Sequence, residues 1–175
     1  MPPRRYHDHG IANALAQLKT NLRVWLADHS DDERTSHELL DQQLQTLSDR
    51  EPLEQLIALT VLATDLTHAA GAGPIIPPQA QRIVVQVFLD RLNEKSPGQA
   101  VEVRVPPFAA IQCIQGPTHT RGTPPNTVET DALTWIRLAT SRVAWADAVA
   151  THLVIISGER ADLSGLLPLV EPSSK

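Results

Sequence analysis

The stretch that decides the fold runs from Arg104 to Arg142 and reads RVPPFAAIQCIQGPTHTRGTPPNTVETDALTWIRLATSR. Its apolar run 108–114 predicts a buried strand, and its Pro- and Gly-rich run 116–126 predicts a loop. Thr130 or Asp131 can then cap a helix whose apolar residues follow at helical spacing. Because a polar loop between two ordered elements is a common place for a binding site, this stretch also holds the main functional candidates.

Strand periodicity begins just before this stretch. Val101, Val103 and Val105 alternate with Glu102 and Arg104, which predicts a half-buried strand. The prolines at 106 and 107 should bend or bulge it, because proline cannot donate to a sheet ladder. Beyond the capped helix, the sequence predicts a short helix over 145–150, a strand over 153–156 and a last short helix over 163–167.

Upstream of residue 75, the apolar pattern is helical. Six residues recur at helical spacing and predict a first helix: Ile11, Leu15, Leu18, Leu22, Trp25 and Leu26. A capping box at 35–38 should start a second helix with Leu40, Leu44 and Leu47 inward. Pro52 should start a third, which runs to about residue 69. The Pro- and Gly-rich run 71–78 breaks the pattern, and a fourth helix is expected over 79–95.

The change from helical to strand periodicity predicts an α+β fold. We expect three parts: an N-terminal helical extension of about three helices over 1–74, an α+β domain over 75–170, and a frayed tail over 171–175. A chain of 175 residues suits one ordinary domain with such an extension.

Composition excludes several classes of protein. The chain is 42% hydrophobic and 20% charged, which is globular, and its net charge of -5 argues against a nucleic-acid binder. Cys113 is alone, so it has no disulfide partner within the chain, and its apolar neighbours predict a buried thiol. The residues after Arg5 are polar rather than apolar, and no run approaches the roughly 20 apolar residues of a membrane span. We therefore expect a soluble, cytoplasmic protein.

The common catalytic and metal motifs are incomplete. The pair His7 and His9 lacks a third ligand, and the histidines at 29, 37 and 68 form no H-x-x-x-H pair. The run 71–73 lacks the Lys of a phosphate-binding loop, and Ser157 lies outside a G-x-S-x-G elbow. The sequence thus predicts no catalytic residue, no metal site and no cofactor.

Two segments resemble a known family. They are 101–142, with VEVRVPPFAAIQCIQG, HTRGTPPN and VETDALTWIRLATSR, and 156–169, which reads ISGERADLSGLLPL. With the helix before them, they resemble the bacterial orthologues of sterol carrier proteins, small proteins of actinobacterial type related to sterol carrier protein 2. The resemblance covers about residues 79–170. It implies a curved mixed sheet covered by helices, with an apolar tunnel for lipids or other hydrophobic molecules.

The same region is similar to the C-terminal domain of mycothiol-dependent maleylpyruvate isomerases. In that domain an Asp-x-x-x-Trp helix precedes a Ser-Gly-Asp strand end. The run 131–135 of this chain fits the helix, and 157–159 has Glu159 in place of Asp. Those isomerases carry a metal in a separate helical domain, and the N-terminal helices here lack its histidine pattern. The isomerase activity is therefore not carried over.

Four residues of the loop region are candidates for the polar mouth of a ligand site. They are His119, Arg121, Asn126 and Glu129. Arg121 could clamp a carboxylate or phosphate, and His119 could change charge near neutral pH. The alternative is a rigid loop in which Arg121 pairs with Glu129 or Asp131.

Five apolar residues are candidates for the lining of a hydrophobic cavity. They are Phe108, Ile111, Trp135, Leu138 and Trp145. Ligand pockets are mostly apolar with a few orienting polar groups, but the same residues could equally form a solid core.

Three functions remain open from the sequence. The first is a non-enzymatic carrier that binds a hydrophobic small molecule or lipid in an apolar tunnel. The second is an accessory module whose core is filled by its own side chains. In that case the N-terminal helices dock a protein partner or a second subunit. The third is an enzyme, or its accessory domain, related to the mycothiol-dependent group.

Overall fold

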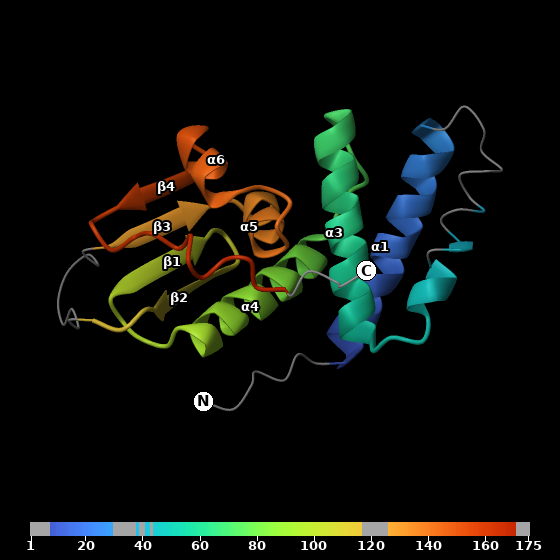
Figure 1. Cartoon of the computed structure of the whole chain (residues 1–175). Coiled ribbons are helices and arrows are strands. Elements are labelled where there is room, and N and C mark those ends of the chain that lie inside the picture. Colours follow the sequence, from blue (N-terminus) through green and yellow to red (C-terminus); the bar gives the residue numbers. More distant parts are fainter. Residues whose placement is uncertain (1–7, 30–37, 39–40, 43, 117–125, 171–175) are drawn as a thin grey trace. The chain divides into compact units, whose positions relative to one another are not determined.

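The computed structural model describes residues 8–29, 38, 41–42, 44–116 and 126–170. The chain divides into two compact units, Met1–Val84 and Val85–Lys175, and each is described by itself. The first unit is helical and the second contains the sheet, so the predicted α+β class is confirmed (Figure 1). The predicted domain boundary near residue 74 stays a prediction, as does the tail 171–175, which lies outside the described residues.

The first unit is built on two long helices that pack against each other, α1 (Asp8–His29) and α3 (Pro52–Ala70). Both were predicted, and Pro52 occupies the first turn of α3 as expected. Leu44 is buried, and the described residues 44–47 of the predicted second helix are helical. The capping box at 35–38 lies largely outside the described residues. The buried stripe on α1 consists of Ile11, Ala14, Leu15, Leu18 and Leu22.

A four-stranded sheet forms the second unit, and α4 (Pro78–Lys95) precedes it in the chain. The strands are β1 (Val101–Val105), β2 (Ala109–Cys113), β3 (Thr127–Thr130) and β4 (Val154–Ser157), in the spatial order β2-β1-β3-β4. The outer pairs are antiparallel, and β1 and β3 are parallel. Prolines 106 and 107 form the turn between β1 and β2, so the predicted bend is a hairpin.

One face of this sheet is buried and the other is open. On β1 the three valines are buried, whereas Glu102 and Arg104 are only half-buried. The register places Arg104 beside Ala110 on β2 and beside Glu129 on β3. Since side chains alternate between the faces of a sheet, these three share the open face.

Two helices lie between β3 and β4 in the chain, and both were predicted. Asp131 caps α5 (Ala132–Ala139), because its Oδ1 accepts the N–H groups of Leu133 and Thr134 at 2.9 and 3.0 Å. Trp135 on this helix is fully buried. The short helix α6 (Trp145–Ala150) has the predicted bounds.

Three expectations about the second unit were wrong. Glu129 was predicted to lie in the loop region, but it belongs to β3, an inner strand of the sheet. The strand β2 is not more fully buried than β1: it lies at the sheet edge, and among its residues only Cys113 is buried. Residues 163–167 form turns rather than a helix. There, the Asp162 carboxylate accepts the Ser164 N–H at 2.8 Å, and Pro168 prevents the helix from continuing.

Asn126 joins three parts of the sheet. Its Nδ2 donates to the Ala100 carbonyl at 2.9 Å, and its Oδ1 accepts the Arg160 N–H at 3.1 Å. Its backbone carbonyl accepts the Glu102 N–H at 3.0 Å. One buried side chain therefore ties the start of β1 to the segment that follows β4.

A close backbone contact forms the base of the β1–β2 hairpin. The Ala100 N–H donates to the Ile114 carbonyl at 3.0 Å, and Ile114 has a positive φ of 62°. A Cβ added at Gly98 would lie 1.9 Å from that same carbonyl oxygen. Only glycine fits at position 98 without moving the backbone.

Replacing Asn126 with Ala should cost about 2 kcal/mol, because two hydrogen bonds worth about 1 kcal/mol each are lost at a buried site. Urea unfolding followed by circular dichroism measures this loss. The control is Gln112→Ala, which removes an exposed amide from the open sheet face and should change stability by less than about 0.5 kcal/mol. Equal stabilities for the two variants would show that Asn126 does not hold the sheet.

Gly98→Ala should destabilise the protein by about 2 kcal/mol or more, because the added methyl group displaces the Ile114 carbonyl. A Cβ at Gly165 meets no atom within 4 Å, so Gly165→Ala is the matched control. The measurement is the melting temperature of both variants. A Gly98→Ala protein that melts with the wild type would contradict the close contact.

Burial raises the pKa of the Cys113 thiol from 9.0 to about 11. The folded state therefore holds this proton more tightly than the unfolded state does. The stabilisation is fully present below pH 9 and is lost as the pH rises through 11. We expect the unfolding free energy of the wild type to fall more steeply over this range than that of Cys113→Ala. Parallel curves for the two proteins would refute this prediction.

Candidate functional site

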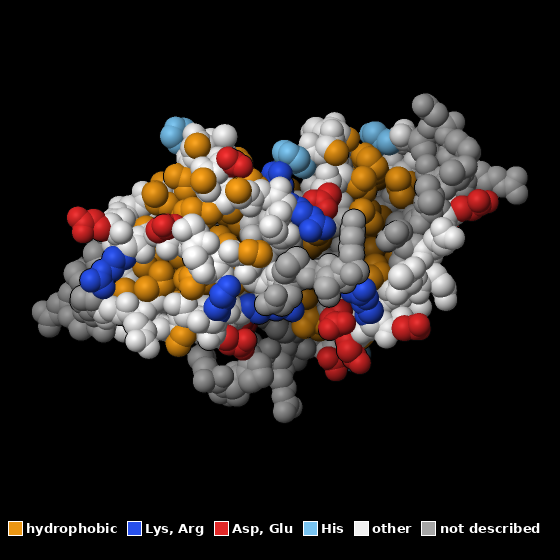
Figure 2. All heavy atoms as spheres, in the orientation of Figure 1, with side chains coloured by type: hydrophobic (Ala, Val, Ile, Leu, Met, Phe, Trp, Pro, Cys, Tyr) orange, Lys and Arg blue, Asp and Glu red, His pale blue; other side chains and the backbone are white. Residues whose placement is uncertain are grey.

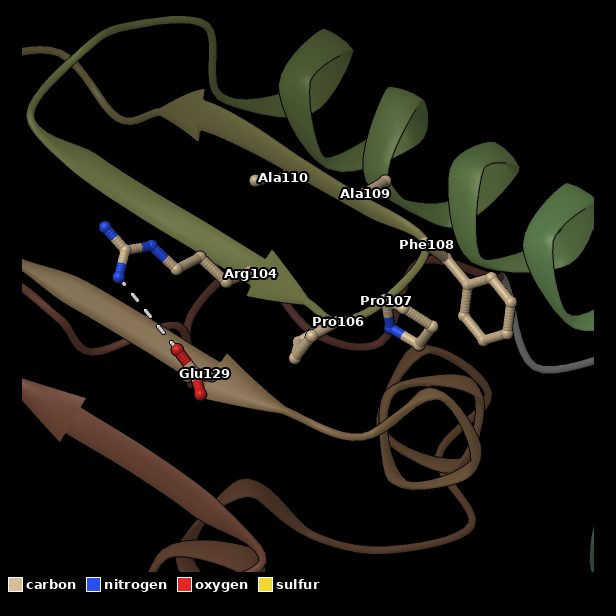
Figure 3. Close-up of a pocket in the computed structure, with 7 residues that line it drawn as sticks. All are labelled: Arg104, Pro106, Pro107, Phe108, Ala109, Ala110 and Glu129. Carbon is tan, nitrogen blue, oxygen red and sulfur yellow. Dashed lines mark ion pairs between the residues drawn. The ribbon is translucent and has the colours of Figure 1, made fainter.

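A pocket open to solvent lies where the β1–β2 hairpin meets β3. Its volume is about 350 Å³, and the close-up in Figure 3 shows the side chains around it. Seven residues line it: Arg104, Pro106, Pro107, Phe108, Ala109, Ala110 and Glu129. Five are apolar and two carry opposite charges, so the pocket has an apolar part and a polar part.

The sheet register brings the polar part together. Arg104 lies between Ala110 and Glu129 in one row across three strands. In Figure 3 the side chains of Arg104 and Glu129 extend toward each other on one side of the sheet. Arg104 Nη1 lies 4.0 Å from Glu129 Oε2, which is the outer limit of an ion pair.

A third charged group lies next to this pair. Arg104 Nε contacts Glu102 Oε1 at 2.5 Å, and both residues belong to β1. The exposed fractions of the side chains are 36% for Arg104, 20% for Glu102 and 45% for Glu129. Such partly exposed pairs add little stability, so their effect is to orient the guanidinium and to set the local charge.

The residues of the hairpin turn form the apolar part of the pocket. The Phe108 N–H donates to the Val105 carbonyl at 2.9 Å, which closes the turn around the two prolines. In Figure 3 the Phe108 ring lies at the end of the pocket away from Arg104 and Glu129. Ala109 and Ala110 follow, and their small side chains leave the space that larger ones would fill.

Two of the predicted site residues line this pocket, Phe108 and Glu129. Phe108 was expected in an apolar lining and Glu129 in a polar mouth, and the pocket places them at its two ends. Glu129 belongs to β3 rather than to the loop. Its ion pair is with Arg104, and Asp131 is used in capping α5.

None of the other predicted site residues that the structure describes lines this pocket. His119 and Arg121 are outside the described residues, and Asn126 bonds backbone groups with both atoms of its amide. The remaining apolar candidates divide by burial. Trp135 and Leu138 are buried on α5, whereas Ile111 on β2 and Trp145 on α6 are half-buried.

The sequence reasoning missed the five other lining residues. One signal for Arg104 was present, because the alternation of β1 already turned it away from the buried valines. The partner strand β3 was not predicted, so the closeness of Arg104 to Glu129 was hidden. The alanines at 109 and 110 carry no chemical signal of their own, and only the hairpin makes them part of a pocket.

Hydrophobic side chains also reach the surface near the last strand. Leu153, Ile155 and Ile156 are 40%, 65% and 44% exposed. Figure 2 shows hydrophobic side chains on the surface over the strands and α6 of this unit. The register places Ile155 beside Glu129 on one side and Arg104 on the other, so this carboxylate has one apolar and one charged neighbour across the sheet.

Within the described residues, no three His, Cys, Asp or Glu side chains are grouped closely enough to hold a metal ion. In the same part of the chain, no helix has the length and apolar character needed to cross a membrane.

Comparison with known proteins identifies the second half of the chain. A search of the curated proteins found no match. The family model described as bacterial SCP ortholog, where SCP stands for sterol carrier protein, matches residues 78–169. This match includes α4, the whole sheet, both short helices and all seven residues of the pocket. Since it covers more than half of the 175 residues, the chain belongs to the family of bacterial sterol carrier protein orthologues.

Proposed function

We propose that this protein binds a hydrophobic small molecule or lipid without transforming it chemically, as a carrier of the sterol-carrier type. The observation that supports this function is the pocket of about 350 Å³ with five apolar residues and one pair of charges. Ligand sites for small molecules typically have this size and this mixture of groups.

The apolar residues would supply most of the affinity. Each Å² of apolar surface removed from water contributes about 25 cal/mol, and this holds for the ligand as well as for the pocket. The two prolines form a stiff part of the wall, so little conformational freedom is lost on binding. Arg104 and Glu129 would orient a polar group at the other end.

A binding role suits the chemistry of the lining. Among its seven residues, which are all within the described part of the chain, there is no hydroxyl, thiol or imidazole that could act as a nucleophile or base. The Cys113 thiol is buried, and its raised pKa keeps it neutral near pH 7. The acid in the lining is Glu129, and it lies beside Arg104.

The wider expectations from the sequence stay predictions beside this proposal. They are the apolar tunnel through residues 79–170, the cytoplasmic location, and the docking of a protein partner or second subunit on the N-terminal helices. A molecule longer than the pocket would need further apolar surface, which either such a tunnel or the exposed side of β4 could provide.

Filling the pocket should weaken binding. Ala110→Trp places a large ring among the lining residues, whereas Gln112→Trp places the same ring on the same face of β2 but outside the lining. Each protein is incubated with a bacterial lipid extract, repurified and extracted with organic solvent, and the released molecules are quantified by mass spectrometry. We expect Ala110→Trp to release about tenfold less than the wild type, since tenfold corresponds to about 60 Å² of lost apolar burial. The Gln112→Trp protein should match the wild type.

Two results would contradict the proposal. One is a wild-type protein that releases no molecule in stoichiometric amount. The other is an equal amount released by all three proteins, which would place binding outside this pocket.

A further inference from the structure

Among the residues that the structure describes, the polar end of the pocket contains more negative than positive charge. The only lining cation among the described residues is Arg104, and its Nε is already bonded to Glu102 at 2.5 Å. With Glu129 included, two carboxylates surround one guanidinium. The local sum is therefore one negative charge, on a chain whose net charge is also negative at -5.

Glu129 is the carboxylate that remains available to a ligand. Its closest contact to Arg104 is 4.0 Å, whereas Glu102 lies much nearer to the guanidinium. It is also the more exposed of the two acids, at 45% against 20%. A cation that reached the pocket could therefore pair with Glu129 without breaking the Glu102–Arg104 contact.

The surroundings of Glu129 suit an amphiphile, which has an apolar chain and a charged head group. On the β1 side its direct neighbour is Arg104, and past Arg104, at the end of β1, the pocket continues to the prolines and to Phe108, whose ring lies away from the carboxylate in Figure 3. On the other side, Ile155 is its neighbour across β3 and β4 and is 65% exposed. A ligand can thus bury an alkyl chain on either side while its head group remains at the carboxylate.

We propose that the pocket selects amphiphiles with an ammonium head group and disfavours those with a carboxylate. This inference rests on the proposed function, because it names the class of ligand for the same pocket. An anionic head group would meet the carboxylates of Glu129 and Glu102, and it would have to compete with Glu102 for Arg104. An ammonium group would pair with Glu129 directly.

Three probes with the same eight-carbon chain test the inference: octylammonium, 1-octanol and octanoate at pH 7 and low salt. Their dissociation constants are measured by isothermal titration calorimetry. For the wild type we expect octylammonium to bind about fivefold more tightly than octanoate, with octanol between them, as for a partly exposed ion pair of about 1 kcal/mol.

Substitution of the carboxylate separates charge from shape. Glu129→Gln keeps the size of the side chain and should bring the three dissociation constants to within twofold of one another. Glu94→Gln is the matched control, since it removes the same charge from an exposed position on α4 outside the lining, and it should leave the order unchanged.

The outcomes distinguish the two proposals. If octanol binds but octylammonium binds no more tightly than octanoate, the head-group selection is wrong and the carrier function stands. The same holds if Glu129→Gln leaves the order unchanged. If none of the three probes binds and the lipid extraction is also empty, the carrier function itself is wrong.

Discussion

The one-sided burial of β1 is the constraint on which the rest of the sheet depends. Its three valines are fully buried, while Glu102 and Arg104 alternate with them on the open face. A shift of register by one residue would exchange the two sets, burying charges and exposing valines. Because β1 pairs with a strand on each side, its orientation also sets which residues of β2 and β3 face outward. The pocket is a consequence: its polar end exists only where the outward residues of three strands meet.

Much of the fold could be predicted from patterns that need no partner. Helical spacing predicted α1, α3 and α4. The capping residue Asp131 predicted where α5 begins. The strand β3 could not be found in this way. Its four residues, Thr127–Thr130, contain one large apolar side chain and no long alternation, and their strand conformation comes from pairing with β1 and β4. The helix predicted over 163–167 was wrong for the opposite reason. The apolar spacing allowed a helix there, but local hydrogen bonds around Asp162 form turns instead.

The candidate site depends still more on tertiary structure. Phe108 and Glu129 could be selected as a large ring and a charge near turns, but their common pocket requires the hairpin and the parallel pairing. Asn126 shows the limit of reasoning by residue type. It was predicted as a ligand group because of its loop position and its amide, and the structure uses both amide atoms to bind backbone groups. No pattern in the sequence distinguishes an amide that meets a ligand from one that meets the chain itself.

The strand order has a consequence for how the sheet is assembled as the chain is made. The hairpin of β1 and β2 can close from neighbouring residues, which is a fast, local event. The other side of β1 needs β3, which comes later in the chain and must run parallel to it. During synthesis, which proceeds from the N-terminus, β1 therefore has a free edge until Asn126 and β3 emerge. The valine-rich centre of the sheet is thus open to pairing with other chains during that interval, and the completion of β3 ends it.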